Sequence, residues 1–191
     1  MAFPYAVFLD LLDVPVLLVG GGTVAVRKAT ALVEAGARVT VVAPVVQPEL
    51  VAMVAEVQVR PYERGEVAAY QLVITATDDP AVNAAVSRDA VLAKVWVNSA
   101  DDPEHCSFIL PAIARQGPIT VAVSTGGASP ALARELRRRV AEQVLTPEAG
   151  AAAVELARQR AEIHAAGAST ESVDWTDRVR AALDGSTAPG T

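Results

Sequence analysis

A short apolar run that ends in three consecutive glycines constrains the fold of this chain more than any other feature. The run Val14–Gly20 has the unbroken apolar character of a strand buried on both faces. After Gly20–Gly22, apolar residues recur at helical spacing until Gly36, which is a typical helix stop. A buried strand, a glycine turn and a helix in this order predict the first unit of a parallel α/β sheet.

The same alternation continues to about residue 100. Further strands are expected at 37–44, 56–62, 70–79 and 94–100, with helices at 47–54 and 80–93. Because strands that alternate with helices are joined by right-handed crossovers, the pattern predicts a doubly wound parallel sheet of the Rossmann type.

The pattern changes after this α/β part. Two strand-like runs, Ser107–Arg115 and Ile119–Thr125, flank a Gln-Gly-Pro turn and predict an antiparallel hairpin. Helices are expected at 129–145, 147–166 and 173–183. We therefore expect a Rossmann domain at 1–113, a hairpin dimerisation and substrate segment at 114–145, a small helical domain at 146–184 and a disordered tail at 185–191. The apolar hairpin would be covered best by a second copy of the chain, which predicts a homodimer.

The spacing of the glycine turn indicates a ligand. Gly20, Gly22 and Ala25 satisfy the pattern G-x-G-x-x-A between a strand and a helix. In this context the first glycine allows the tight turn, the second lets a pyrophosphate approach the main chain, and the alanine lets the helix pack closely. The pattern predicts a dinucleotide site, and the alternative is a glycine-rich turn without a ligand.

The end of the second expected strand departs from the usual pattern. Many NAD sites carry an acidic residue there, which holds the ribose hydroxyls. Residues 41–45 read Val-Val-Ala-Pro-Val, without an acid and without a closely following arginine. We therefore expect NAD rather than NADP, held through the main chain around Pro44 and Val45.

Composition narrows the functional class further. A net charge of -6 argues against nucleic acid as a partner. The absence of an early basic residue, and an uncharged run at 14–26 that is too short for a bilayer, predict a soluble cytoplasmic protein without membrane attachment. The basic residues nevertheless gather between Arg134 and Arg139, where an acidic small molecule could bind; the alternative is an ordinary solvated face.

The segment Val97–Phe108, Val-Asn-Ser-Ala-Asp-Asp-Pro-Glu-His-Cys-Ser-Phe, concentrates reactive side chains after the fifth expected strand. A stable metal site is not expected, because the adjacent His105 and Cys106 lack the further ligands that zinc needs. Cys106 is expected to pack as a small apolar residue, and a transient contact of His105 with a metal stays open. A carboxylate at the carboxyl end of a parallel strand lies where ligands bind.

Several segments together resemble one family. "GGGTVAVRK", "VNSADDPEHCSF" and "STGGASP" occur in the order and at about the spacing of precorrin-2 dehydrogenases, which are also found as the amino-terminal module of siroheme synthases. The resemblance covers residues 3–145 closely. It implies an NAD-binding Rossmann domain, a dimerisation segment and a small helical domain. It also implies oxidation of precorrin-2 to sirohydrochlorin with NAD and, in some members, insertion of Fe²⁺.

The resemblance also suggests roles for individual residues. It places the essential aspartate on Asp101. The residues we expect at the cofactor, from the turn and from the resemblance together, are Gly20, Gly22, Thr23, Val24, Pro44, Val45, Thr77, Asp78 and Asn98. Those we expect at the acidic substrate are Arg115, Thr125, Arg134, Arg137 and Arg138. Thr125 stands where some fused relatives carry a phosphorylated serine.

Some alternatives remain open at this point. Asp101 could act as a general base, or it could position and polarise the macrocycle. Asp78 and Asp79 could cap the helix that begins at Pro80 or contact the cofactor. The competing function is a non-catalytic regulatory module that senses NAD, which would need neither a carboxylate after the fifth strand nor a basic face.

Overall fold

The computed structural model describes residues 5–100 and 106–185, and it divides the chain into two compact units. The first unit is Met1–Leu110 and the second is Pro111–Thr191. Asp101, Asp102 and His105 lie outside the described residues, as does most of the predicted tail. The predicted domain boundaries at 113, 145 and 184 stay predictions.

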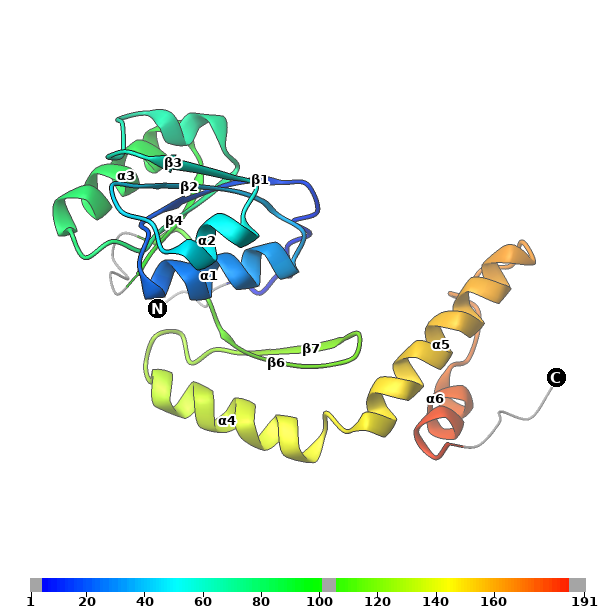
Figure 1. The fold of residues 1–191 in the computed structure, drawn as a ribbon. Coiled ribbons are helices and arrows are strands. Elements are labelled where there is room, and N and C mark those ends of the chain that lie inside the picture. Colours follow the sequence, from blue (N-terminus) through cyan, green and yellow to red (C-terminus); the bar gives the residue numbers. More distant parts are fainter. Residues whose placement is uncertain (1–4, 101–105, 186–191) are drawn as a thin grey trace. The chain divides into compact units, whose positions relative to one another are not determined.

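The first unit is built on a parallel sheet (Figure 1). Its strands are β1 (Pro15–Val19), β2 (Arg38–Ala43), β3 (Glu56–Val59), β4 (Leu72–Thr75) and β5 (Trp96–Ser99). They lie in the order β3-β2-β1-β4-β5, and every neighbouring pair is parallel. The order reverses between β1 and β4, so the predicted Rossmann-type sheet is confirmed, with its switch point beside the glycine turn.

Helices cover both faces of this sheet. They are α1 (Thr23–Glu34), α2 (Pro48–Met53), the 3-10 helix η1 (Glu66–Ala69) and α3 (Pro80–Ala93). α1 and α2 pack on one face, through Ala25, Ala29 and Leu50 against alternate residues of the strands. α3 and η1 pack on the other face, where Val67 and Val86 are fully buried. Alternate residues of the three inner strands β1, β2 and β4 therefore supply two separate cores, as expected for strands buried on both sides.

The strands are shorter than the apolar runs suggested. β3 was expected to reach Tyr62 but ends at Val59, where the Arg60 amide still donates to the Ala43 carbonyl and Pro61 has no amide to donate. β4 ends at Thr75 rather than at Asp79. The residues after Thr75 therefore form a loop at the carboxyl edge of the sheet.

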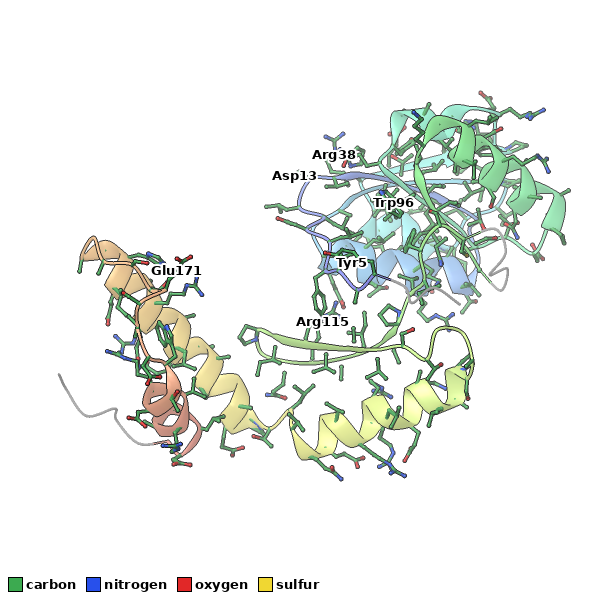
Figure 2. All side chains as sticks on the ribbon, turned by 180° about the vertical axis from the view of Figure 1, so that it is seen from behind. Tyr5, Asp13, Arg38, Trp96, Arg115 and Glu171 are labelled. Atoms are coloured by element: carbon green, nitrogen blue, oxygen red, sulfur yellow. The ribbon has the colours of Figure 1, made fainter. Side chains whose placement is uncertain are left out.

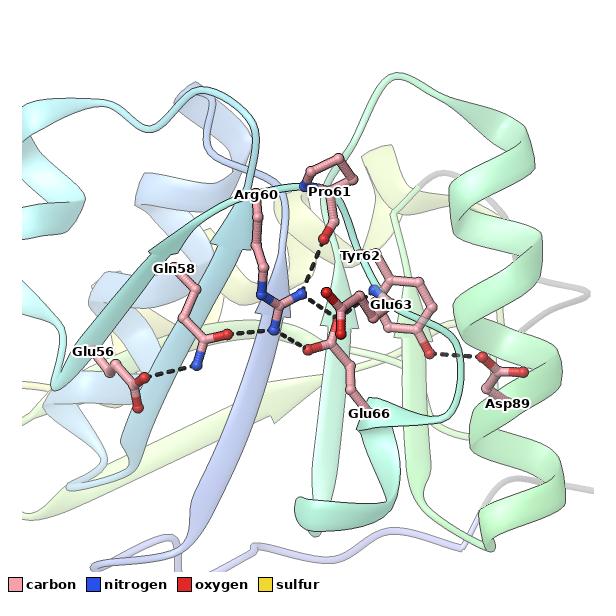
Figure 3. A network of polar contacts seen from close by, with 8 residues as sticks. All are labelled: Glu56, Gln58, Arg60, Pro61, Tyr62, Glu63, Glu66 and Asp89. Carbon is pink, nitrogen blue, oxygen red and sulfur yellow. Dashed lines mark hydrogen bonds and ion pairs between the residues drawn. The ribbon is translucent and has the colours of Figure 1, made fainter.

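A polar network holds the segment between β3 and α3 (Figure 3). The Arg60 guanidinium forms an ion pair with Glu66, with an N–O distance of 2.6 Å. The buried Asp89 carboxylate accepts hydrogen bonds from the Tyr62 hydroxyl at 2.9 Å and from the Gly65 amide at 2.8 Å. Burial acts to raise the pKa of Asp89, but these two donors and nearby Arg64 outweigh it, so that the pKa lies below its usual range.

The second unit contains the predicted hairpin and three helices. Its elements are β6 (Ala112–Gln116), β7 (Ile119–Val123), α4 (Pro130–Gln143), α5 (Pro147–Ala165) and α6 (Thr176–Leu183). The hairpin is antiparallel as expected, with Gln116 paired to Ile119 across the turn. The first hairpin strand was expected from Ser107, but residues 107–109 belong to the first unit, where Ser107 bonds to Val97. Among the described helices, none combines the length and apolar character that a bilayer crossing requires.

Candidate functional site

The glycine turn after β1 has a geometry that only glycine satisfies at its first position. Gly20 has a φ of 129°, a region that residues with a side chain rarely adopt. A Cβ atom at Gly20 would lie 2.3 Å from the Ala76 carbonyl oxygen at the end of β4. The Gly20 amide donates to the Val42 carbonyl at 3.0 Å. The turn is thereby wedged between the carboxyl ends of β2 and β4.

The second glycine joins this turn to the loop after β2. A Cβ at Gly21 would lie 2.0 Å from the Val45 carbonyl oxygen, so no other residue fits without moving the main chain. The Gly21 carbonyl accepts a hydrogen bond from the Gln47 amide at 3.0 Å. Two loops that are more than 20 residues apart in sequence therefore form one surface at the carboxyl edge of the sheet.

The third glycine and the start of α1 form an open cradle. A Cβ built at Gly22 meets no atom of the described residues within 4 Å. Gly22 is the N-cap residue of α1, no side chain caps this helix, and its first main-chain bond runs from the Val26 amide to the Gly22 carbonyl. The amides of the first turn, at Thr23 and Val24, therefore point out of the helix end with its positive dipole. This arrangement fits the pyrophosphate of a dinucleotide.

One side chain missed in the sequence borders this cradle. The Gln47 side chain amide donates to the Thr23 hydroxyl, with an Nε2–Oγ1 distance of 3.2 Å. Gln47 is the N-cap residue of α2, yet its side chain caps nothing in that helix. Glutamine carries no recognised signature for such a position, so only the folded arrangement of the two loops reveals it.

The residues that follow β2 are exposed but apolar, without the acidic side chain that is common at NAD sites. Ala43 is buried, whereas Pro44 and Val45 are exposed at the carboxyl edge. Because neither has a polar side chain, any contact there with a ribose uses main-chain groups or apolar surface. The expectation that Pro44 and Val45 contact the cofactor stays a prediction.

The two aspartates in the loop after β4 have different environments. Asp79 is the N-cap of α3 and accepts hydrogen bonds from the Ala81 amide at 2.8 Å and the Val82 amide at 3.4 Å. Asp78 is exposed, and no hydrogen bond of its carboxylate is found among the described residues. Of the two roles expected for these aspartates, Asp79 takes the capping role. Asp78 remains available to contact a ligand.

Thr77, expected at the cofactor, already has local partners. Its hydroxyl oxygen lies 3.0 Å from Asn83 Oδ1 and accepts the Asp79 amide at 3.1 Å. The Asn83 amide donates to the Thr77 carbonyl at 3.0 Å. These bonds connect the loop after β4 to the first turns of α3, beside the glycine turn. A cofactor contact of Thr77 stays a prediction.

Hydrogen bonds between β5 and residues 106–108 form a clasp at the base of the segment that follows β5. The Ser99 amide donates to the Cys106 sulfur at 3.1 Å, and the thiol donates to the Ser99 carbonyl at 3.3 Å. The buried Asn98 amide donates to the Phe108 carbonyl at 3.0 Å. Cys106 is therefore more than the small apolar residue expected, because its thiol bonds to the main chain. The side-chain amide of Asn98 already donates to Phe108. A cofactor contact of Asn98 stays a prediction.

The hydrogen bonds between Ser99 and Cys106 join the two described residues that flank the segment with the predicted catalytic residue. Asp101 itself lies outside the described residues, as does His105. The residues on either side of it, Ser99 and Cys106, are bonded to each other at the carboxyl end of β5. The segment that carries Asp101 therefore starts and ends at the sheet edge where the glycine turn also lies. Among the described residues, no group of three His, Cys, Asp or Glu side chains could hold a metal.

The predicted substrate arginines of the second unit are not equivalent. Arg138 forms ion pairs with Glu135 at 2.8 Å and with Glu142 at 2.6 Å. The Glu135 and Glu142 carboxylates raise the pKa of Arg138, and the hydrogen bonds from Arg138 and Arg139 lower the pKa of Glu135 to about 2. Arg134 and Arg137, by contrast, have no carboxylate partner among the described residues and are the better candidates for an anionic ligand.

Two further predicted substrate residues lie near the hairpin. Arg115 is exposed on β6, opposite Thr120 and one residue before the end of the strand (Figure 2). The Thr125 hydroxyl accepts the Ser129 amide at 3.0 Å and lies 3.1 Å from the Ser129 carbonyl oxygen. Ser129 in turn caps α4 by accepting the Leu132 amide. Thr125 thus shapes the loop before α4, and contact with substrate stays a prediction for both residues.

Comparison with known families agrees with this geometry. Residues 7–112 match the family described as putative NAD(P)-binding. Residues 116–143 match the family described as the central part of a sirohaem biosynthesis protein. The first match covers the glycine turn and the whole parallel sheet, and the second covers most of the hairpin and α4.

Individual relatives extend the comparison. A siroheme synthase from Methylobacillus flagellatus is 47% identical over 138 residues, which are 70% of this chain and 30% of that protein. Siroheme synthase 1 from Aeromonas salmonicida is 42% identical over 167 residues, 85% of this chain and 36% of that protein. The chain thus spans about a third of the length of these curated relatives.

A solved structure matches nearly end to end. SirC, a precorrin-2 dehydrogenase, superposes with a TM-score of 0.73 and 27% identity, covering 95% of this chain and 98% of that one. The resemblance seen in the sequence motifs is thereby confirmed. The chain belongs to the putative NAD(P)-binding family, and its residues 116–143 are similar to the central part of sirohaem biosynthesis proteins.

Proposed function

We propose that this chain is an NAD-dependent precorrin-2 dehydrogenase of siroheme synthesis. The observation that carries the proposal is the match to SirC, a protein of that activity, over 98% of its length. The reaction removes a hydride and a proton from precorrin-2 and yields sirohydrochlorin, NADH and H⁺. Because the chain spans only about a third of the siroheme synthases it matches, the proposal is limited to this oxidation.

The first unit would hold the cofactor. The open space at Gly22 and the outward amides of Thr23 and Val24 suit its pyrophosphate. Gly20 keeps the turn in place, while Pro44 and Val45 would lie along the adenosine. When bound, NAD would supply the hydride acceptor. The lack of an acid or an arginine just after β2 supports NAD over NADP, because nothing there recognises a 2′-phosphate.

Asp101 would contribute the carboxylate of the reaction. It follows β5 by two residues, on a segment whose ends are tied together at the carboxyl edge of the sheet. In the proposed role it accepts the proton that leaves the macrocycle or polarises the ring from which the proton leaves. Either role needs an ionised carboxylate close to the substrate.

The second unit would recognise the acidic substrate. Precorrin-2 carries several carboxylates, and an acidic chain needs local positive charge to bind it. Arg134 and Arg137 lie three residues apart on α4 and share a face of that helix. Arg138 would contribute less, because Glu135 and Glu142 already neutralise it.

The test of this proposal is a direct assay. The purified chain is mixed with NAD and precorrin-2, and the absorbance of NADH and of sirohydrochlorin is followed. Formation of both products in equal amounts supports the proposal. Binding of NAD without turnover of precorrin-2 would instead favour the regulatory NAD-sensing module.

We propose insertion of Fe²⁺ into sirohydrochlorin as a separate activity of the chain, in which the metal ion is a substrate. Addition of Fe²⁺ or Co²⁺ to the same mixture distinguishes a bifunctional enzyme from a dehydrogenase. Consumption of sirohydrochlorin faster than in a protein-free control would assign the second activity, with His105 as a candidate for transient metal contact. An unchanged rate would limit the chain to the oxidation.

We also propose that the chain forms a homodimer through its second unit. β6 and β7 pair only with each other among the described strands, so each has an open edge. Ile113 on the hairpin and Leu132 on α4 are about half exposed, which leaves apolar surface uncovered. Light scattering during gel filtration tests this, and a monomeric mass at micromolar concentration would contradict it.

A further inference from the structure

Gln47 has a polar contact that helix capping does not explain. Residues at an N-cap normally bond to the amides of their own helix. The Gln47 side chain instead crosses to the neighbouring loop and donates to the Thr23 hydroxyl at 3.2 Å, while its main-chain amide donates to Gly21 at 3.0 Å. Gln47 is thus fixed at two points to the loop that forms the cradle.

The bond from Gln47 determines what the Thr23 hydroxyl can do. A hydroxyl has one proton to donate, and its oxygen can accept. Because the oxygen accepts from Gln47, the proton is directed away from the amide. Thr23 is the first residue of α1 and is exposed, next to the open space at Gly22. The remaining proton is therefore available to the cradle, where an anion would accept it.

We propose that Gln47 is a positioning residue for the cofactor pyrophosphate: it orients the Thr23 hydroxyl so that this group donates to a phosphate oxygen. The inference rests on the proposed binding of NAD and adds a residue to that site. It also accounts for an uncharged residue at this place. A carboxylate would accept the Thr23 proton instead of donating to its oxygen, and it would repel the phosphates.

Calorimetric titration of the full chain with NAD tests this role without any measurement of turnover. Gln47→Leu should raise the Kd for NAD by about 3- to 10-fold, the usual effect of losing one hydrogen bond. Gln47→Glu should raise the Kd further, because it reverses the direction of the bond and adds a negative charge. Gln71→Leu is the matched control, since Gln71 is exposed beside the amino end of β4 and should leave the Kd unchanged.

A double-mutant cycle separates positioning from a general effect on the loops. Thr23→Val removes the hydroxyl and keeps the shape of the side chain. In that background Gln47→Leu should change the Kd for NAD by less than about twofold, because the group that it orients is absent. In the Thr23→Ser background, where a hydroxyl remains, the full effect of Gln47→Leu should return.

Adenosine provides the second readout, because it has no phosphate. Its affinity should be the same for the native chain and for Gln47→Leu if the effect lies at the pyrophosphate. Equal NAD affinity of the native chain and Gln47→Leu would overturn this inference alone. Equal losses for NAD and adenosine, or additive effects in the cycle, would overturn it as well. Failure of the native chain to bind NAD would overturn the proposed function instead.

Discussion

Ser107 bonds to Val97 through both its side chain and its main chain. The Val97 amide donates to the Ser107 hydroxyl oxygen at 2.7 Å, and the Ser107 amide donates to the Val97 carbonyl at 2.8 Å. Val97 is a fully buried residue of β5. These bonds, together with those between Ser99 and Cys106, hold the two ends of the segment that carries Asp101.

Ser107→Ala should lower the free energy of unfolding by about 1–3 kcal/mol, because it leaves the Val97 amide without its acceptor inside the protein. Urea unfolding followed by circular dichroism measures the change. Ser87→Ala is the matched control. The Ser87 hydroxyl is buried and has no hydrogen-bond partner among the described residues, so its removal should leave stability unchanged or raise it. Equal losses of unfolding free energy in Ser107→Ala and Ser87→Ala would contradict a stabilising role of the hydrogen bonds between Ser107 and Val97.

The adjacent glycines 21 and 22 should respond in opposite ways to alanine. In Gly21→Ala the new Cβ would lie 2.0 Å from the Val45 carbonyl oxygen, so the loops must separate and the melting temperature should fall by several degrees. In Gly22→Ala the Cβ meets no atom within 4 Å in the part of the chain that the structure describes, so the melting temperature should stay unchanged. The affinity for NAD should nevertheless fall, because the methyl group occupies the cradle. Thermal unfolding and NAD titration of both variants check this contrast.

Asp89 should make stability depend on pH in the acidic range. Its pKa in the folded chain is below the ordinary value of 3.8, so its ionised form stabilises the fold at pH values above that value. The contribution is lost as the pH falls through the folded pKa. Asp89→Asn should therefore cost about 1–3 kcal/mol at neutral pH.

The difference between the native chain and Asp89→Asn should shrink steadily as the pH falls below about 4. Denaturant unfolding at a series of pH values measures it. Tyr62→Phe should reproduce part of the loss, because it removes one of the two short hydrogen bonds to the carboxylate. A difference that stays constant from neutral pH to pH 3 would show that the charge of Asp89 is unimportant.

Asp101→Ala should abolish the oxidation of precorrin-2 while the Kd for NAD stays within about twofold of the native value. The reason is that the proposed carboxylate acts on the substrate, whereas the cofactor is held by the glycine turn. Asp101→Asn keeps the shape and removes the charge, and it should be as inactive. An Asp101→Ala protein that turns over at the native rate would exclude the catalytic role.

The two aspartates before α3 should differ in their contribution to stability. Asp79→Ala removes the acceptor for the Ala81 and Val82 amides and should cost about 1 kcal/mol. Asp78→Ala, one position earlier, should leave the free energy of unfolding unchanged, since Asp78 is exposed and no hydrogen bond of its carboxylate is found in the described part of the chain. If Asp78 contacts the cofactor, Asp78→Ala should change the affinity for NAD alone.

Local features of the chain were readable from the sequence. The parallel sheet follows from buried apolar runs that alternate with helices, and the turn from Gly20 and Gly22 in their strand–helix context. The helix starts at Pro80 and Pro130 also follow, because proline is favoured in the first turn of a helix, but only the structure shows that Asp79 and not Asp78 caps α3. The spacing of Glu135 and Glu142, three residues before and four residues after Arg138, also indicates the ion pairs that neutralise this arginine.

What the sequence determined by itself is therefore the kind of fold and the glycine turn, because both depend on periodicity and on conformations available within a few residues. Tertiary structure alone decided which distant groups meet. Gln47 reaches Thr23 across 24 residues because β2 lies beside β1, and Gly21 is required by a carbonyl at Val45 that only this strand order brings close. Hydrogen bonds and steric contacts act over a few ångströms of space, whatever the separation along the chain.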